Sequence, residues 1–258
     1  MGKKKTLTGI QAWMPQDPAL KPYYEGVVQF VEKHLPHAGE RPESGKIIHV
    51  PLNGDIHFAA HEIAIIDTPL FQRLREIKQV GLAYLVFPSL THSRFEHSLG
   101  VVGRLDQLLA HVLRNTEQQG SSFALREKVE KYTIPLRLAA LLHDLGHCLF
   151  SHCSERVVNQ LKGTPGSYPS SPEIRRLFTD HFRRKSLIPF AELFAVTILG
   201  TQRFYDFFKD LDFPRKSDKD IQVYLSQAAR FILGLPMLDD PETVFLSQLL
   251  SGGLDADK

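Results

Sequence analysis

An apolar segment that contains an adjacent histidine and aspartate constrains the fold of this 258-residue chain more than any other feature. The segment covers residues 136–150, and His143 and Asp144 follow the apolar helix that its first half predicts. The segment predicts a buried helix, in which a carboxylate without a partner would cost several kcal/mol. A divalent cation accepts both an imidazole nitrogen and a carboxylate oxygen. The sequence therefore predicts a helical core with two metal ligands at the end of one helix.

Helical patterns fill most of the chain after a single hairpin signal. Asn53-Gly54 lies between short alternating segments and predicts strands over residues 47–52 and 55–58. Helices are expected over residues 23–34, 70–80, 93–109, 136–150, 173–182, 190–208, 220–233 and 241–250, with a Gly-, Pro- and Ser-rich loop over 162–172. We predict an all-α fold with a small β-hairpin near the N-terminus. Residues 1–45 are expected to form an N-terminal extension and residues 46–258 the main domain.

Composition excludes several classes of protein. Lys3, Lys4 and Lys5 supply more than the whole net charge of +2, so the body of the chain has no basic excess and nucleic-acid binding is not supported. No apolar run approaches the ~20 residues that a membrane span needs, so no membrane association is expected. Two cysteines cannot form a disulfide framework, which favours a reducing, cytoplasmic location.

Twelve histidines are the unusual count in the composition, and several of them stand near the charged pair. His147 would share a helical face with His143 if the helix continued, and His152 follows shortly after. Upstream, Arg94 stands one helical turn before His97. That spacing places a cation suited to phosphate beside another candidate metal ligand.

Simpler roles are open for the same residues. His147 could cap a helix C-terminus or bond to a carbonyl in the core. His143, Cys148, His152 and Cys153 could form a structural zinc site, although their spacing is crowded for a closed tetrahedral centre. Otherwise the two cysteines are small packing residues.

Several separate motifs stand in an order that resembles a known family. They read IDTP at 66–69, FQRLR at 71–75, HSRFEHSLG at 92–100, LHDLGH at 142–147 and LDADK at 254–258. In this order they resemble the HD-domain deoxynucleoside triphosphate triphosphohydrolases, including the vertebrate members that join an HD domain to a sterile alpha motif. The resemblance implies a helical HD fold and a metal-dependent phosphohydrolase that converts a deoxynucleoside triphosphate (dNTP) into deoxynucleoside and triphosphate.

The resemblance also implies roles for individual residues. The metal, which would be Mn, Fe, Mg or Zn, is expected on His97, His143, Asp144 and Asp257. Catalysis is expected from Arg94, His147, His152 and Glu155. Arg94 is also expected to bind the substrate phosphates, with Gln79 and Val80 on the sugar and base side of the pocket.

Some members of the family carry a nucleotide-activator site at a subunit interface, which implies a homo-oligomer. The matching positions here are Asp67, Gln72 and Arg75. A simpler interpretation is that Asp67 caps the helix that Pro69 opens and that Arg75 pairs with a nearby acid.

Two departures from the family pattern motivate rival functions. Where a His-Glu pair is expected, the chain has Ala191-Glu192, and His181 is an alternative histidine without the following Glu. The family also continues beyond the position of Asp257, so we expect the domain to be truncated at its C-terminal end. The rivals are another HD-domain nucleotidase or phosphodiesterase and a catalytically inactive nucleotide-binding or assembly module.

Overall fold

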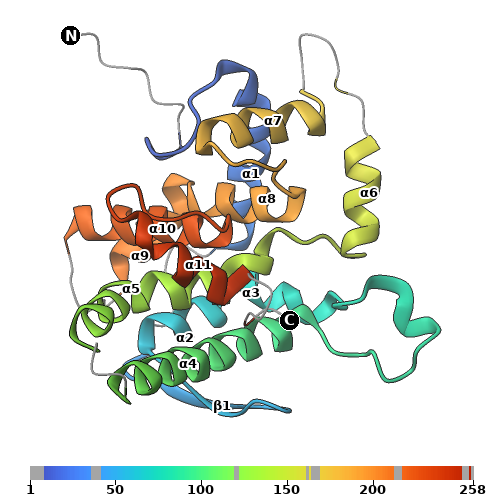
Figure 1. The fold of residues 1–258 in the computed structure, drawn as a ribbon. Coiled ribbons are helices and arrows are strands. Elements are labelled where there is room, and N and C mark those ends of the chain that lie inside the picture. Colours follow the sequence, from blue (N-terminus) through green and yellow to red (C-terminus); the bar gives the residue numbers. More distant parts are fainter. Residues whose placement is uncertain are drawn as a thin grey trace, which may run out of the picture.

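A computed structural model describes residues 9–35, 42–118, 122–160, 163, 169–211, 217–251 and 256. Within these residues the chain is helical except for one antiparallel hairpin, which confirms the predicted all-α fold (Figure 1). No helix in this part of the chain is long and apolar enough to cross a bilayer.

The hairpin consists of β1 (Lys46–Val50) and β2 (Gly54–Phe58), with Val50 paired to Gly54. The predicted turn is confirmed, but the first strand ends at Val50 rather than at residue 52, because residues 51–53 form the loop. Gly54 has a φ of +76°, a left-handed conformation that glycine adopts without steric cost.

The α-helices are α1 (Lys21–His34), α2 (Ala60–Ile66), α3 (Pro69–Gln72), α4 (Arg94–Gln118), α5 (Ser122–Leu142), α6 (His152–Gln160), α7 (Ser171–Phe182), α8 (Phe190–Leu199), α9 (Gln202–Asp210), α10 (Asp218–Ile232) and α11 (Val244–Ser251). Short 3-10 helices are η1 (Pro18–Leu20), η2 (Arg73–Glu76), η3 (Gly81–Leu85), η4 (His143–Gly146) and η5 (Pro241–Thr243). The predicted helices over 23–34, 93–109, 173–182, 220–233 and 241–250 are therefore confirmed, with shifted ends.

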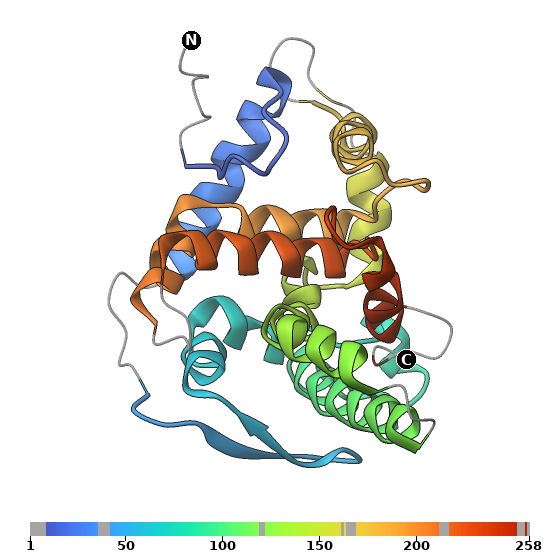
Figure 2. The ribbon, with the colours of Figure 1, turned by 60° about the vertical axis from the view of Figure 1, so that its left-hand side comes forward.

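Two pairs of helices form two layers that pack on one another. α4 and α5 lie side by side in one layer, and the hairpin runs along the outer face of α4 (Figures 1 and 2). α8 and α10 lie side by side in the other layer, where α10 packs on α5 and α8 packs on η4 (Figure 2). Leu141 and Leu142 have no exposed surface, so the end of α5 is buried as the apolar pattern predicted.

The predicted helix over 70–80 is wrong. α3 and η2 occupy its first part, after which Ile77 is extended and Lys78 forms an isolated bridge with Ser93. The carbonyl of Ile77 accepts a hydrogen bond from Arg94 N at 2.8 Å. Pairing with the start of α4 therefore replaces local helix propensity in this segment.

Three other predicted boundaries differ. The segment 190–208 divides into α8 and α9. Between them Thr201 pairs with Ile10, from the region before α1, and the Thr201 hydroxyl caps α9. α5 begins at Ser122, so Pro135 lies inside it rather than at its start, and α5 ends at Leu142. The sequence did not predict α6. Of the loop expected over 162–172, the last two residues belong to α7 and most of the others lie outside the described residues.

Candidate metal and catalytic site

Three side chains that the sequence predicted as metal ligands converge at the end of α5. His97 comes from α4, whereas His143 and Asp144 come from η4, and their candidate ligand atoms all lie within 4.8 Å of one another. His97 Nε2 is 3.8 Å from Asp144 Oδ2, and His143 Nε2 is 3.5 Å from Asp144 Oδ1. The two imidazoles therefore approach the two oxygens of one buried carboxylate.

The local backbone explains how this cluster forms. The α-helix gives way to the tighter turn η4 at His143, and a Cβ at Gly146 would lie 1.9 Å from the carbonyl oxygen of Ala191 in α8. Only glycine permits that approach. His143 Nδ1 lies 2.8 Å from the carbonyl of Ala140, so a proton on Nδ1 leaves the Nε2 lone pair available to a metal.

His147 joins the cluster by a route that the sequence did not predict. The helix does not continue to it, so it shares no helical face with His143. Instead η4 turns the chain so that His147 Nε2 lies 3.3 Å from Asp144 Oδ1. His147 is 7% exposed, and its buried Nδ1 has no hydrogen-bond partner among the described residues.

Arg94 is the cation of the cluster and is only 2% exposed. Its Nη1 donates to Asp144 Oδ2 at 2.6 Å. Its Nη2 donates to the carbonyl of Gln79 at 3.3 Å and to the hydroxyl of Ser151. Arg94 thus lies beside the candidate metal ligands, and its guanidinium is held by protein groups.

The charges of this cluster shift the pKa values of its members. Burial raises the pKa of Asp144, but the cationic forms of His143 and His147 and the Arg94 guanidinium outweigh burial and hold it well below its usual range. Burial lowers the pKa of His147, and Asp144 opposes that effect. The site therefore favours the ionised carboxylate of Asp144, which is the form that binds a divalent cation.

A second group of candidate ligands adjoins the first and contains the other predicted catalytic residues. His147, His152 and Glu155 have ligand atoms within 4.8 Å of one another, and the two imidazole rings lie 5.3 Å apart at 90°. His152 Nδ1 lies 3.2 Å from Glu155 Oε2. Neither group of candidate ligands, among the residues described, contains Cys148 or Cys153, so the alternative zinc site is not formed.

The structure brings Ala191 to this second group and leaves His181 away from it. Ala191 N donates to Glu155 Oε1 at 2.9 Å. The following residue, Glu192, forms an ion pair with Arg184 at 2.6 Å. His181 lies in α7, and its Nε2 is instead 3.1 Å from the carbonyl of Trp13 near the N-terminus.

The two substrate-pocket candidates lie next to Arg94. Gln79 contacts both Arg94 and Ser151 through its carbonyl, and its side-chain Oε1 is buried. Val80 follows directly and precedes η3.

The three activator candidates contact one another or neighbouring side chains. Gln72 accepts a hydrogen bond from Arg75 Nε at 2.6 Å, and the Arg75 guanidinium stacks on Phe95. Asp67 pairs with Lys46 of β1 at 3.6 Å. The capping alternative for Asp67 is wrong, since Thr68 caps α3. Among the described residues Arg75 contacts an amide and an aromatic ring rather than the expected acid.

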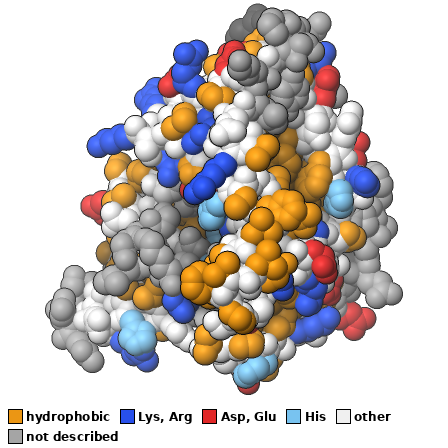
Figure 3. Space-filling model, turned by 90° about the vertical axis from the view of Figure 1, so that its right-hand side faces the viewer, with side chains coloured by type: hydrophobic (Ala, Val, Ile, Leu, Met, Phe, Trp, Pro, Cys, Tyr) orange, Lys and Arg blue, Asp and Glu red, His pale blue; other side chains and the backbone are white. Residues whose placement is uncertain are grey.

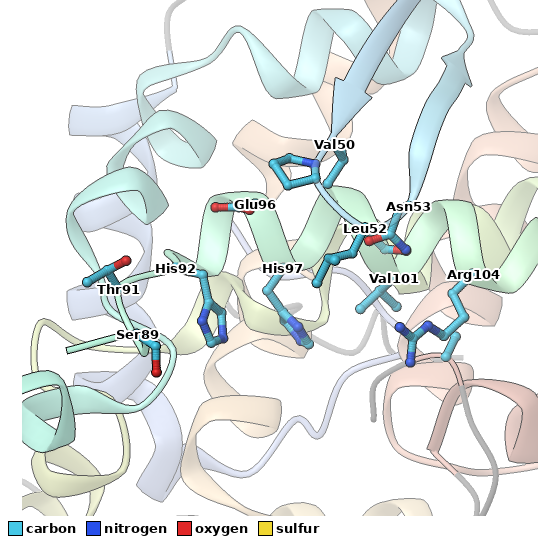
Figure 4. Close-up of a pocket in the computed structure, with 13 residues that line it drawn as sticks. Val50, Leu52, Asn53, Ser89, Thr91, His92, Glu96, His97, Val101 and Arg104 are labelled. Carbon is cyan, nitrogen blue, oxygen red and sulfur yellow. The ribbon is translucent and has the colours of Figure 1, made fainter. Parts of the chain in front are cut away.

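The predicted fourth ligand, Asp257, lies outside the described residues. Its neighbour Ala256 is described and buried, and it lines a cavity of about 530 Å³ together with His97. Figure 4 shows His92, His97 and Arg104 on one side of α4 in this cavity, whose other wall is the tip of the hairpin.

Two residues at the site were missed by sequence reasoning. Ser151 is fully buried, with a φ of +51°, and accepts a hydrogen bond from Arg94. Arg73 donates to the carbonyls of Leu145 and His147 in the turn that carries the ligands. Ser151 stands beside His152 in the sequence, and Arg73 stands in the FQRLR motif, but neither signal indicated the role of the residue at the site.

Comparison with known proteins agrees with this geometry. Residues 94–206 match the HD domain family. A deoxynucleoside triphosphate triphosphohydrolase SAMHD1 homolog of Dictyostelium discoideum is 37% identical over 135 residues, which are 52% of this chain and 25% of that protein. The deoxynucleoside triphosphate triphosphohydrolase SAMHD1 of Homo sapiens is 45% identical over 107 residues, which are 42% of this chain and 16% of that protein.

A solved structure supports the same fold. The crystal structure of a phosphohydrolase from Bacteroides thetaiotaomicron superposes with a TM-score of 0.50 at 27% identity, covering 83% of this chain and 39% of that one. The chain therefore contains an HD domain. Over this region it is homologous to the deoxynucleoside triphosphate triphosphohydrolases, and it spans a quarter or less of the length of the two curated relatives named above.

Proposed function

We propose that this chain is a metal-dependent phosphohydrolase that converts a dNTP into deoxynucleoside and triphosphate. The observation that carries the proposal is the convergence of His97, His143 and Asp144 beside the buried guanidinium of Arg94. Imidazole and carboxylate suit a divalent cation, and an arginine beside them suits phosphate. The named activity of the relatives in this region supports dNTPs as the substrate class.

The residues fit a divalent metal, which we propose to be Mn, Fe, Mg or Zn. The orientation of His143 by the Ala140 carbonyl and the low pKa of Asp144 both favour the metal-binding forms of these side chains. Asp257 is the proposed fourth ligand, and the position of its neighbour Ala256 in the cavity that His97 also lines supports it. When bound, the metal would polarise a phosphoryl oxygen and make water a better nucleophile.

The protein's own groups would supply the remaining chemistry. Arg94 and His147 would offset negative charge that develops on the α-phosphate. His152 would exchange a proton with the leaving group, while Glu155 holds its Nδ1 at 3.2 Å and so fixes the orientation of the ring. Gln79 and Val80 would contact the sugar and base, which their position next to Arg94 supports.

The product of hydrolysis tests the proposal. Purified protein is analysed for bound metal and then incubated with mixed dNTPs and each candidate metal. Inorganic triphosphate together with free deoxynucleoside is the expected result. Monophosphate, pyrophosphate or free phosphate would instead indicate another HD-domain nucleotidase or phosphodiesterase.

Ala191 motivates a second candidate function, an inactive nucleotide-binding or assembly module. Ala191 lies at Glu155 where the family pattern has a histidine, and general acid catalysis typically contributes ~10²–10⁴-fold in rate. Bound metal and nucleotide affinity without turnover would support the module. Turnover that appears only in an Ala191→His variant would identify the missing proton donor as the cause.

Regulation and assembly are further proposals. Asp67, Gln72 and Arg75 would bind a nucleotide activator, which the Gln72–Arg75 contact at the protein surface supports. The homo-oligomer and the cytoplasmic location stay predictions.

Apolar side chains gather on the face that Figure 3 shows, and the exposed ones near η3 and α6 include Leu85, Val86, Phe87, Leu149 and Phe150. Sedimentation of wild type and a Phe87→Ser variant would test self-association through this face.

A further inference from the structure

A partly buried arginine outside the predicted site bonds to the turn that carries the candidate catalytic residues. Arg73 lies in η2, and its Nη1 donates to the carbonyl of His147 at 2.9 Å while its Nη2 donates to the carbonyl of Leu145. Its guanidinium also lies 5.2 Å from the ring centre of Phe30 in α1. Arg73 thus joins three distant segments of the chain at the back of the turn η4.

The end of a helix explains why such a residue matters there. The last carbonyls of a helix have no partner within it, and a cationic side chain is a favourable donor to them. Burial lowers the pKa of Arg73 to about 10, so the guanidinium stays charged at neutral pH. Both hydrogen bonds are therefore charge-assisted, which makes them stronger than neutral ones.

The two carbonyls, of Leu145 and His147, belong to the same short segment as the candidate catalytic groups. Leu145 follows Asp144 directly, and His147 presents its Nε2 to Asp144 Oδ1 at 3.3 Å. At Gly146 the same turn lies against the carbonyl of Ala191 in α8. Contact with α8 and the hydrogen bonds from Arg73 therefore both limit displacement of the turn.

We propose that Arg73 is a positioning residue, which fixes η4 so that His147 and Asp144 keep their relative placement for catalysis. The role of Arg73 in catalysis rests on the proposed phosphohydrolase function, whereas its effect on the turn does not. Arg73 bonds to the backbone carbonyls of Leu145 and His147 and not, among the described residues, to a candidate ligand side chain, so it acts through the backbone of this turn.

Hydrogen exchange and kinetics of an Arg73→Met variant test the proposal. The amide of His147 donates to the carbonyl of Asp144 at 3.1 Å, so its exchange rate reports on the turn. We expect roughly tenfold faster exchange at this amide. We expect kcat to fall roughly 10–100-fold with little change in KM, because small misplacements of catalytic groups cost rate rather than binding.

Two further variants keep the test sharp. Arg230→Met is the matched control, because Arg230 is also a partly buried arginine with a lowered pKa that donates to a carbonyl, that of Pro236 at 2.7 Å. It should leave η4 exchange and kcat unchanged. Arg73→Lys keeps the charge but cannot span both carbonyls, so exchange and kcat should fall between Arg73→Met and wild type. This variant decides the question if Arg73→Met does not fold.

The outcomes separate the two proposals. Wild-type exchange at η4 in the Arg73 variants would overturn the positioning role, as would equal acceleration in Arg230→Met. Faster exchange with unchanged kcat would overturn the link to catalysis. Absence of nucleotide turnover in the wild type would refute the proposed function, and the exchange rates would then still decide whether Arg73 fixes the turn.

Discussion

The ion pair between Arg94 and Asp144 yields a quantitative prediction about stability. The two residues are 2% and 3% exposed, so solvent screens their attraction little. At a separation of 2.6 Å and an effective dielectric constant of 20, the gross Coulomb attraction is about 6 kcal/mol. Removing one partner of such a pair leaves a buried charge and costs roughly 3–5 kcal/mol. Asp144→Asn should therefore destabilise the metal-free protein by about that amount.

Thermal unfolding in the presence of a chelator measures this loss. At roughly 2–4 °C per kcal/mol for a domain of this size, Asp144→Asn should lower Tm by about 6–20 °C. Adding Arg94→Met to Asp144→Asn should restore part of the loss, because it removes the unpaired charge. A Tm change below about 2 °C in the single variant, or a double variant less stable than the single one, would refute the reasoning.

The same ion pair determines in which direction the stability of the protein changes with pH. The pKa of Asp144 is held low in the folded state, so its ionised form stabilises the protein above the unfolded value of about 4. This contribution is lost as the pH falls through the folded-state pKa. The difference in stability between wild type and Asp144→Asn should therefore be constant near neutrality and shrink only in acid.

Three further predictions follow from individual contacts. His143→Ala should weaken Mn²⁺ binding at least roughly 100-fold in competition with a chelating dye, whereas His181→Ala, away from the cluster, should not. Gly146→Ala should cost roughly 3 kcal/mol in urea unfolding, since the new Cβ would meet the carbonyl of Ala191; an unchanged midpoint would contradict the packing. Burial raises the pKa of Glu192 in the folded protein above its value in the unfolded chain. Ionisation of Glu192 therefore lowers the stability of the protein as the pH rises between these two pKa values. Glu192→Gln should gain Tm relative to wild type as the pH rises from about 4 to about 8, and a pH-independent difference would show the reasoning to be wrong.

Local signals predicted much of the fold. The Asn53-Gly54 turn was identified because its chemistry is local. The start of the helix predicted over 93–109 was also close, and there the Ser93 hydroxyl accepts a hydrogen bond from Glu96 N. Boundaries that depend on distant segments were predicted wrongly. The segment after η2 leaves the helix because Ile77 bonds to Arg94, and the break before α9 exists because Ile10 pairs with Thr201.

The sequence by itself determined which chemical groups this protein has for its site. An apolar helix ending in His143 and Asp144 needs a compensating partner whatever the rest of the fold is, because burying a carboxylate alone is costly. The tertiary structure decided how these groups meet. It placed His97 near Asp144, paired the buried Arg94 with the same carboxylate and brought Arg73 to the carbonyl of His147. Such contacts join residues far apart in the chain, and their free energy depends on packing that no local pattern records.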